Sequence, residues 1–115
     1  MGTTRAADAA LRRGSADVLV MSILEERPRH GYDIAKLIAR RSNGVLAFHA
    51  ASLYPLLYRM EARGWIQGRW VEKPAERRRR HYSLTSSGRS ELAKRRSGWN
   101  VFIAALTRVA GLDHA

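Results

Sequence analysis

Four stretches of the chain repeat apolar residues at the three- and four-residue spacing of a buried helix face. The first, with Ser15 as its N-cap and a proline shortly after its end, predicts a helix over 16–26. The second closes at Asn43 and Gly44 and predicts a helix over 31–41. The apolar stripes of these two helices consist of Val18, Leu19, Ile23, Leu24, Ile34, Ala35, Leu37 and Ile38.

The third stretch begins near Ser52, ends at Gly64 and carries Pro55 close to its start. Proline has no amide hydrogen, so it fits if Ser52 is the N-cap and Pro55 lies in the first turn. If the helix instead begins nearer His49, a local distortion is expected. The predicted buried face holds Leu53, Leu56, Leu57 and Met60, and the opposite face holds Ser52, Pro55, Arg59 and Arg63.

After the third helix the pattern changes to the alternation of a strand. Ile66 and Trp70 share one face of residues 65–71, and Tyr82 shares a face of the return strand with Leu84. The polar loop between the strands contains a proline and a run of arginines, and it is too long for a two-residue turn. The sequence therefore predicts a β-hairpin directly after the third helix.

A final helix is predicted after Thr85, which is a suitable N-cap. Some of its apolar residues are seven positions apart, the spacing of a helix that packs along another helix. Because the first three helices already supply a core, this stripe predicts pairing with a second copy of the chain. The expected dimerisation residues are Leu92, Trp99, Phe102, Ile103 and Leu106.

These elements predict a mainly α fold with a small β-hairpin: a winged helix-turn-helix followed by a C-terminal dimerisation helix. We expect a basic, mobile N-terminal arm over 1–14, the winged helix-turn-helix over 15–84 and the dimerisation helix over 85–111. At 115 residues, the chain has room for one modest core.

The charge balance narrows the choice of partner. With 21 Lys and Arg against 10 Asp and Glu, the net charge of +11 favours nucleic acid first and an anionic membrane surface second. There is no Cys, and no apolar run approaches the length of a membrane span, so we expect a soluble cytoplasmic protein. The four histidines are scattered, and no catalytic arrangement is present. We therefore expect no metal, no cofactor and no enzyme activity.

Four motifs, in this order and spacing, resemble the PadR family of transcriptional regulators. The resemblance covers roughly residues 12–112 and implies a cytoplasmic, dimeric winged-helix repressor that controls genes for detoxification, efflux or stress and is released by a small molecule. The chain departs from the family before the third helix, where His49, Ala50 and Ala51 replace the usual Ser or Thr, Pro and Gly. The motifs are HGYDI (30–34), SLYPLLYRME (52–61), GWI (64–66) and RHYSLTSSG (80–88).

The candidate DNA contacts lie on the third helix, at the start of the second and in the hairpin. Arg59 and Arg63 can read guanine edges or hold phosphates; the alternative is a solvated helix face. Tyr54 resembles a family position near DNA, and both Tyr54 and Tyr32 can reach a phosphate or serve as buried anchors. The arginine run suits phosphate or minor-groove contact; the alternative is a basic loop without specific contacts. The full set is Tyr32, Ser52, Tyr54, Pro55, Arg59, Arg63, Arg77, Arg78, Arg79 and Arg80.

Trp99 has two interpretations. In family members of this length, a tryptophan at the matching place lines a cavity at the dimer interface, so the resemblance implies a site where a small aromatic effector stacks. The alternative is a packed dimer core, where aromatic anchors are common.

Together these observations predict a ligand-responsive repressor that binds double-stranded DNA as a homodimer, at an inverted-repeat operator. Two other classes of protein share the charge. A basic RNA-binding module would prefer RNA and need no palindrome. An adaptor that uses the winged domain only for protein contacts would not need the arginine run.

Overall fold

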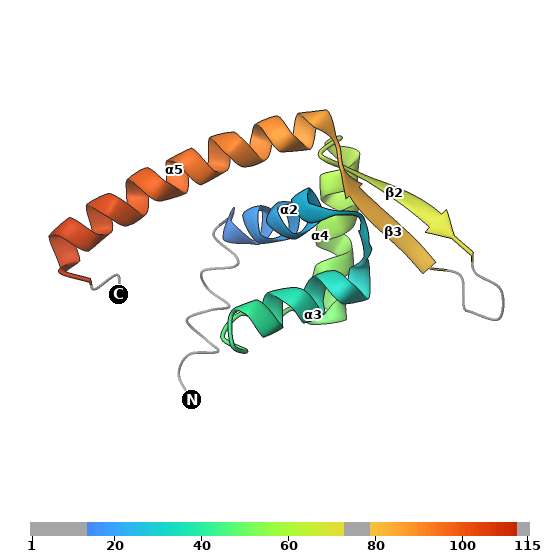
Figure 1. The fold of residues 1–115 in the computed structure, drawn as a ribbon, viewed down its shortest axis with the longest axis horizontal. Coiled ribbons are helices and arrows are strands. Elements are labelled where there is room, and N and C mark those ends of the chain that lie inside the picture. The colour runs from blue at the N-terminus through green and yellow to red at the C-terminus, as the bar shows by residue number, and fades with distance from the viewer. Residues whose placement is uncertain (1–13, 73–78, 113–115) are drawn as a thin grey trace.

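The computed structural model describes residues 14–72 and 79–112, and its helices carry most of the described chain (Figure 1). The sequence-predicted helices over 16–26 and 31–41 are confirmed, as is the final helix after Thr85. Arg77 and Arg78 of the wing, and all but one residue of the expected N-terminal arm, lie outside the described residues. The elements are α2 (Ala16–Glu26), β1 (Arg29–His30), α3 (Gly31–Arg41), α4 (Ala50–Ala62), β2 (Ile66–Val71), β3 (Arg79–Leu84) and α5 (Ser86–Ala110).

The sheet has one strand more than the predicted hairpin. Strands β2 and β3 pair antiparallel, with Ile66 opposite Leu84, and β1 pairs with the other edge of β3. In this second pairing Arg29 lies opposite Tyr82. A two-residue strand shows no alternation in the sequence, so the sequence predicted only a turn at this position. By joining the sheet, β1 holds the start of α3 beside β3.

The hydrophobic core forms where α2, α3 and α4 pack together under the sheet and the first half of α5 (Figure 1). The apolar face predicted for α4 is fully buried, as the spacing of its leucines required. Burying one such side chain contributes about 1.5–3 kcal/mol. The buried apolar residues are Val20, Met21, Ile23, Leu24, Ile34, Ile38, Leu53, Leu56, Leu57, Met60, Ile66, Tyr82 and Leu92.

Helix α4 begins earlier than it would with Ser52 as its N-cap. His49 is the N-cap in extended conformation, and its carbonyl oxygen accepts the amides of Ser52 and Leu53, both at 2.9 Å. Ala50 and Ala51 are strong helix formers, so the helix begins about one turn before the start that Ser52 would set as N-cap. The expectation that Ser52 caps α4 is wrong, and Pro55 lies beyond the first turn, where the carbonyl of Ala51 loses its usual amide donor.

Of the capping expectations for the other helices, those for the start of α5 and the end of α3 are confirmed, and the one for the start of α2 is not. Thr85 caps α5 as predicted, because its hydroxyl accepts the amide of Gly88 at 2.9 Å. Ser15 precedes α2 in a helical conformation and makes no side-chain capping hydrogen bond. Asn43 and Gly44 close α3 with positive φ angles of 54° and 80°, as expected of a left-handed helix end.

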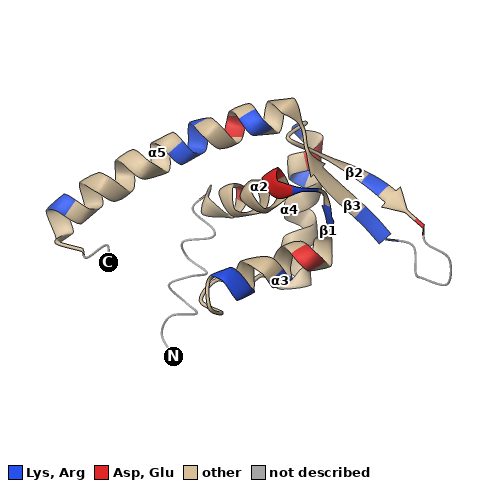
Figure 2. Ribbon diagram, viewed as in Figure 1, with Lys and Arg blue, Asp and Glu red and all other residues tan. Residues whose placement is uncertain are grey.

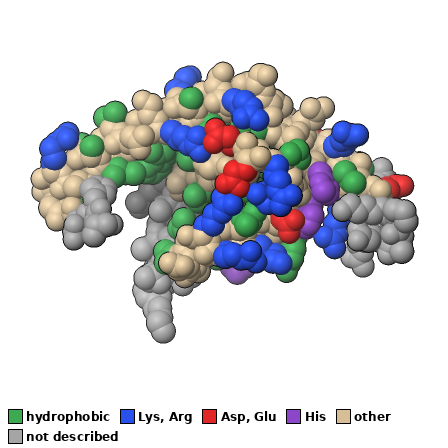
Figure 3. All heavy atoms as spheres, viewed as in Figure 1, with side chains coloured by type: hydrophobic (Ala, Val, Ile, Leu, Met, Phe, Trp, Pro, Cys, Tyr) green, Lys and Arg blue, Asp and Glu red, His purple; other side chains and the backbone are tan. Residues whose placement is uncertain are grey.

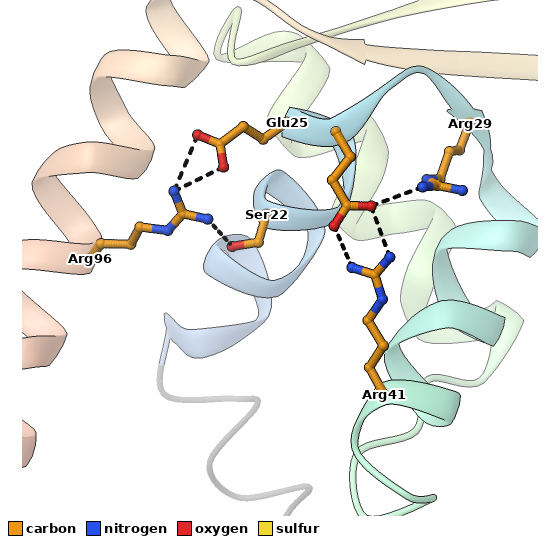
Figure 4. A network of polar contacts seen from close by, with 6 residues as sticks. Ser22, Glu25, Arg29, Arg41 and Arg96 are labelled. Atoms are coloured by element: carbon orange, nitrogen blue, oxygen red, sulfur yellow. Dashed lines mark hydrogen bonds and ion pairs between the residues drawn. The ribbon is translucent and has the colours of Figure 1, made fainter.

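Ion pairs join α5 to α2 at the surface. Arg95 lies 2.8 Å from Asp17 of α2 and, within α5, 2.7 Å from Glu91. Arg96 lies 3.0 Å from Glu25 of α2 (Figure 4). Leu92, on the same part of α5, is fully buried in the core of its own chain. It therefore has no surface to offer a partner, unlike the other four predicted dimerisation residues.

A second polar cluster joins the end of α2 to α3 and β1. The Glu26 carboxylate contacts Arg41 and Arg29 (Figure 4). The hydrogen bonds from Arg41, with help from Arg29, lower the pKa of Glu26 from 4.5 to about 2. A carboxyl group with a lowered folded-state pKa stabilises the fold above its unfolded pKa, and this contribution is lost as the pH falls from 4.5 through about 2.

Candidate nucleic-acid interface

Helix α4 presents an exposed face opposite its buried one. Ser52, Pro55 and Arg59 are exposed, as the sequence predicted, and Tyr58 adds a ring that is 56% exposed. The side chain of Arg59 makes no hydrogen bond or ion pair with any described residue. A helix with such a face is of the size that a DNA major groove admits.

Arg63 occupies a different position from Arg59. It is the C-cap residue of α4, and its guanidinium lies 5.1 Å from the centre of the Trp65 ring. This contact holds Arg63 at the end of the helix, although the side chain remains exposed. Of the two predicted arginines, Arg59 is therefore the one more free to reorient toward a partner.

The start of α3 brings Tyr32 and Tyr54 to the same region. Tyr32 is 63% exposed and stacks on His30, with ring centres 6.4 Å apart. Tyr54 is half-buried against Gly31, where a Cβ atom would lie only 2.9 Å from Tyr54 Cε1. Glycine is required there because any side chain would displace the Tyr54 ring. Tyr54 thus packs as an anchor between α4 and α3, while Tyr32 faces solvent.

His30 connects this region to the wing. Its Nδ1 accepts the amide of Asp33 at 3.4 Å, which caps α3, and its Nε2 lies 3.0 Å from Arg79 Nη1. Partial burial lowers the pKa of His30 below 6.5. The ring is therefore mainly neutral at pH 7, and Arg79 supplies the positive charge beside the N-terminus of α3.

The described wing arginines have unequal roles. Figure 2 shows basic residues on both β2 and β3. Arg79 is exposed, whereas Arg80 forms an ion pair with Glu61 of α4 and lies 5.5 Å from the Trp70 ring. Glu61 also accepts the amide of Gly68 at 3.2 Å. Arg80 therefore braces the hairpin against α4, a role that the sequence analysis did not assign. Its charge is largely compensated by Glu61, so it contributes less to an anion-binding surface than its place in the arginine run predicted.

Arg69 is a cation of the wing to which the sequence analysis assigned no role. It is exposed on β2 and pairs in register with His81. Side chains two positions apart on a strand share a face, so Arg69 and Arg79 lie on the same side of the hairpin. The strand alternation of residues 65–71 is the sequence signal that could have identified Arg69 as an exposed cation.

Residues 14–72 and 79–112 contain neither a membrane-spanning helix nor a cluster of metal ligands. No described helix combines the length and apolar character needed to cross a bilayer. No three His, Asp or Glu side chains within these ranges gather as ligands for a metal ion.

Comparison with known proteins identifies the family. The profile of the transcriptional regulator PadR-like family matches residues 20–94. The fold superposes on a PadR family transcriptional regulator from Eggerthella lenta with a TM-score of 0.78 and 28% identity, covering 95% of this chain and 93% of the other. A PadR family regulator from Clostridium difficile gives a TM-score of 0.74 and 28% identity over 84% of this chain and 99% of the other.

A third similar structure is Bacillus subtilis PadR in complex with operator DNA, with a TM-score of 0.64 and 22% identity over 70% of this chain and 45% of that protein. At this identity the likeness shows the shared fold alone. The profile match spans more than half of the chain and includes α3, α4 and the wing. The chain belongs to the PadR-like family, which is a family of transcriptional regulators and not of enzymes.

Proposed function

We propose that the protein is a sequence-specific DNA-binding repressor that acts in the cytoplasm as a homodimer on an inverted-repeat operator. The observation that carries this proposal is the exposed face of α4 beside a cationic wing. The structure of Bacillus subtilis PadR with operator DNA supports the choice of partner, because that protein shares the fold.

Each subunit would place α4 in a major groove and the wing on the flanking backbone. Arg59 lies in the middle of the exposed face of α4, and Arg69 and Arg79 share one side of the hairpin. Tyr32 lies beside the N-terminal amides of α3, which favour an anion such as a phosphate. The proposed DNA contacts are Tyr32, Ser52, Pro55, Arg59, Arg63, Arg69, Arg77, Arg78 and Arg79, with Tyr54 and Arg80 as supports.

Two quantities follow from this arrangement. A two-fold symmetric dimer predicts half-site centres about 34 Å apart, which is one turn of DNA. If about six phosphates are contacted, log affinity should fall against log salt with a slope near 5. A titration of a promoter duplex at several salt concentrations measures the slope, and an affinity independent of salt would contradict the electrostatic part of the proposal.

The second half of α5 is the proposed dimer interface. Figure 1 shows it extending beyond the core, and Figure 3 shows apolar side chains along it. Phe102 is 55% exposed, Ile103 is 40% exposed and Val109 is 89% exposed in a single chain. An apolar stripe of this length requires a partner, and a second copy of α5 offers a matching stripe.

Replacing Leu106 by glutamate is expected to convert the dimer to a monomer. The substitution places a charge in an apolar interface. The residues three and four positions from Leu106 on α5, which share its face, are all uncharged. The matched control is Ala104→Glu, because Ala104 is exposed on the opposite side of the helix. Sedimentation velocity should show a monomer for Leu106→Glu and a dimer for Ala104→Glu. Equal behaviour of the two variants would contradict the assignment of this interface.

The proposal includes a small aromatic effector. Trp99 is half-buried and meets Phe102 edge to face, with ring centres 5.9 Å apart. This pair would lie at the start of the dimer interface, where a planar ligand stacks or where the two rings simply pack against the partner helix. Quenching of Trp99 fluorescence by a planar aromatic compound would support the first alternative.

A further inference from the structure

The end of α4 meets the start of α5 (Figure 1), and backbone groups hold the two together. The hydroxyl group of Thr85 lies 2.6 Å from the carbonyl oxygen of Gly64 and 3.0 Å from that of Trp65. The amide of Thr85 donates to the same Trp65 carbonyl oxygen at 3.0 Å. We call this contact, between residues 63–65 and residues 85–95, the α4–α5 joint.

Side chains complete the joint around the half-buried ring of Trp65. The guanidinium group of Arg63 lies 5.1 Å from the centre of this ring, and that of Arg95 lies 4.7 Å from it. An indole ring attracts a cation placed over it. Arg95 also pairs with Asp17 of α2 and with Glu91, and its hydrogen bond lowers the pKa of Glu91 below 4.5. Arg95 therefore ties α5 both to α2 and to the segment that follows α4.

Arg95 is a stronger attachment of α5 than its neighbour Arg96. The side chain of Arg95 is 26% exposed, whereas that of Arg96 is 43% exposed and pairs with the equally exposed Glu25. Exposed ion pairs contribute little to holding two elements together. The second half of α5 extends beyond the core toward the proposed dimer interface (Figure 1). The contacts of Arg95 therefore help to set the direction in which this half of the helix leaves the winged domain.

The place of the joint, at the end of α4, gives it control over the start of that helix. Helix α4 has 13 residues and is about 20 Å long. A tilt of about 10° at the joint would therefore move the start of α4 by about 3.4 Å, which is one base-pair step of DNA. In a two-fold dimer the two α4 helices move in opposite directions, so their separation would change by up to about 7 Å.

We propose that Trp65 and Arg95 are positioning residues for DNA recognition, because they fix the angle between α4 and α5 and thereby the half-site spacing that the dimer accepts. This inference rests on the proposed function. Neither residue is among the proposed DNA contacts, and both act through the position of α4. The residues on α4 select the sequence of each half-site, and the joint selects the distance between the two half-sites.

Spin labels on the two α4 helices of the dimer test the joint without DNA. The chain has no Cys, so Ala51→Cys gives one labelling site in each subunit, at the exposed start of α4. Pulsed electron spin resonance then measures the distance between the two labels. With the joint intact, the full-length protein should give one narrow distance distribution. Adding Arg95→Met, which removes the guanidinium group, should broaden the distribution by up to about 7 Å, as a tilt of about 10° requires.

The matched control is Lys94→Met, because Lys94 is the exposed neighbour of Arg95 on α5 and its loss removes the same charge. This variant should keep the narrow distribution. Arg95→Lys keeps a cation beside Trp65 and should restore most of the narrow distribution. Thermal unfolding shows that each labelled variant is folded before it is frozen. If Arg95→Met does not fold, Trp65→Met removes the same contact and should broaden the distribution in its place.

Distributions as narrow as that of the control in both Arg95→Met and Trp65→Met would overturn the proposal. The absence of any distance between labels in the Ala51→Cys protein would overturn it as well, because the chain would then form no dimer whose spacing the joint sets.

A duplex with one base pair inserted between the half-sites tests the link to spacing. Wild-type protein should bind this duplex about tenfold more weakly than the promoter, the cost of one lost base contact, and Arg95→Met should lose less than about threefold. An equal loss in the two proteins would overturn the inference and leave the proposed function standing. Equal binding of the promoter and a scrambled duplex by wild-type protein would instead contradict the proposed function itself.

Discussion

Replacing Gly88 by alanine is expected to lower the free energy of unfolding by about 3 kcal/mol, the upper part of the range for overpacked sites. A Cβ atom on Gly88 would lie 2.0 Å from the carbonyl oxygen of Trp65, which is backbone and cannot turn aside. That carbonyl also accepts the amide and the hydroxyl of Thr85, both at 3.0 Å. Any shift that relieves the clash therefore disturbs the N-cap of α5.

Thermal unfolding measures the effect of Gly88→Ala. For a domain of this size, the expected loss corresponds to a decrease in Tm of about 12 °C or more. The matched control is Ser87→Ala, because Ser87 is the exposed neighbour of Gly88 in the same first turn of α5. It should change the free energy of unfolding by less than about 0.5 kcal/mol. A Gly88→Ala protein as stable as the control would contradict the close contact between α5 and the start of β2.

Replacing Arg59 by alanine is expected to weaken binding of operator DNA by about ten- to a hundredfold. This range corresponds to the 1–3 kcal/mol that one arginine contact to a base contributes. Arg59 is exposed on α4 and has no described partner, so its loss should leave the free energy of unfolding nearly unchanged. The comparison of operator with scrambled duplex shows what Arg59 contacts. A base contact lowers selectivity, and a phosphate contact weakens both duplexes equally.

The control for Arg59→Ala is Lys94→Ala. Lys94 is exposed on α5, away from the proposed interface, and its substitution removes the same charge. A general effect of net charge would weaken binding equally in the two variants. That result, or wild-type affinity in Arg59→Ala, would show that the exposed face of α4 does not meet DNA.

The helices were predictable because their buried residues follow a single period. The leucines of α4 and the isoleucines of α3 lie at helical spacing and are all buried. Gly64, with a φ angle of 79°, ends the turn after α4 in the left-handed region that glycine favours. Such local signals need no knowledge of the rest of the chain.

The features that the sequence did not reveal depend on contacts between distant residues. Strand β1 exists because Arg29 and His30 meet β3, which lies about fifty positions further along the chain. Leu92 belongs to the heptad stripe of α5, but the first half of α5 crosses the core, so Leu92 is buried there. The stripe alone cannot distinguish these two kinds of burial.

The same limit applies to the candidate interface. The exposed face of α4 was predicted residue by residue, because exposure on a helix follows from its buried face. The different roles of Arg79, which is exposed, and Arg80, which pairs with Glu61, were not predicted, because only the fold brings Glu61 beside Arg80. The cavity of about 310 Å³ lined by aromatic rings was not predicted either, because its rings come from β1, α3, α4, β2 and β3 and converge only in the folded chain.

The central claim is sequence-specific binding to duplex DNA, and a gel-shift titration tests it most directly. The protein is titrated against a duplex from its own promoter region and a scrambled duplex of equal length, at about 150 mM salt to suppress purely electrostatic binding. Structured RNA is included as a competitor. The account predicts tighter binding to the promoter duplex, retained in the presence of RNA. Equal affinity for both duplexes, or displacement of the promoter by RNA, would contradict it.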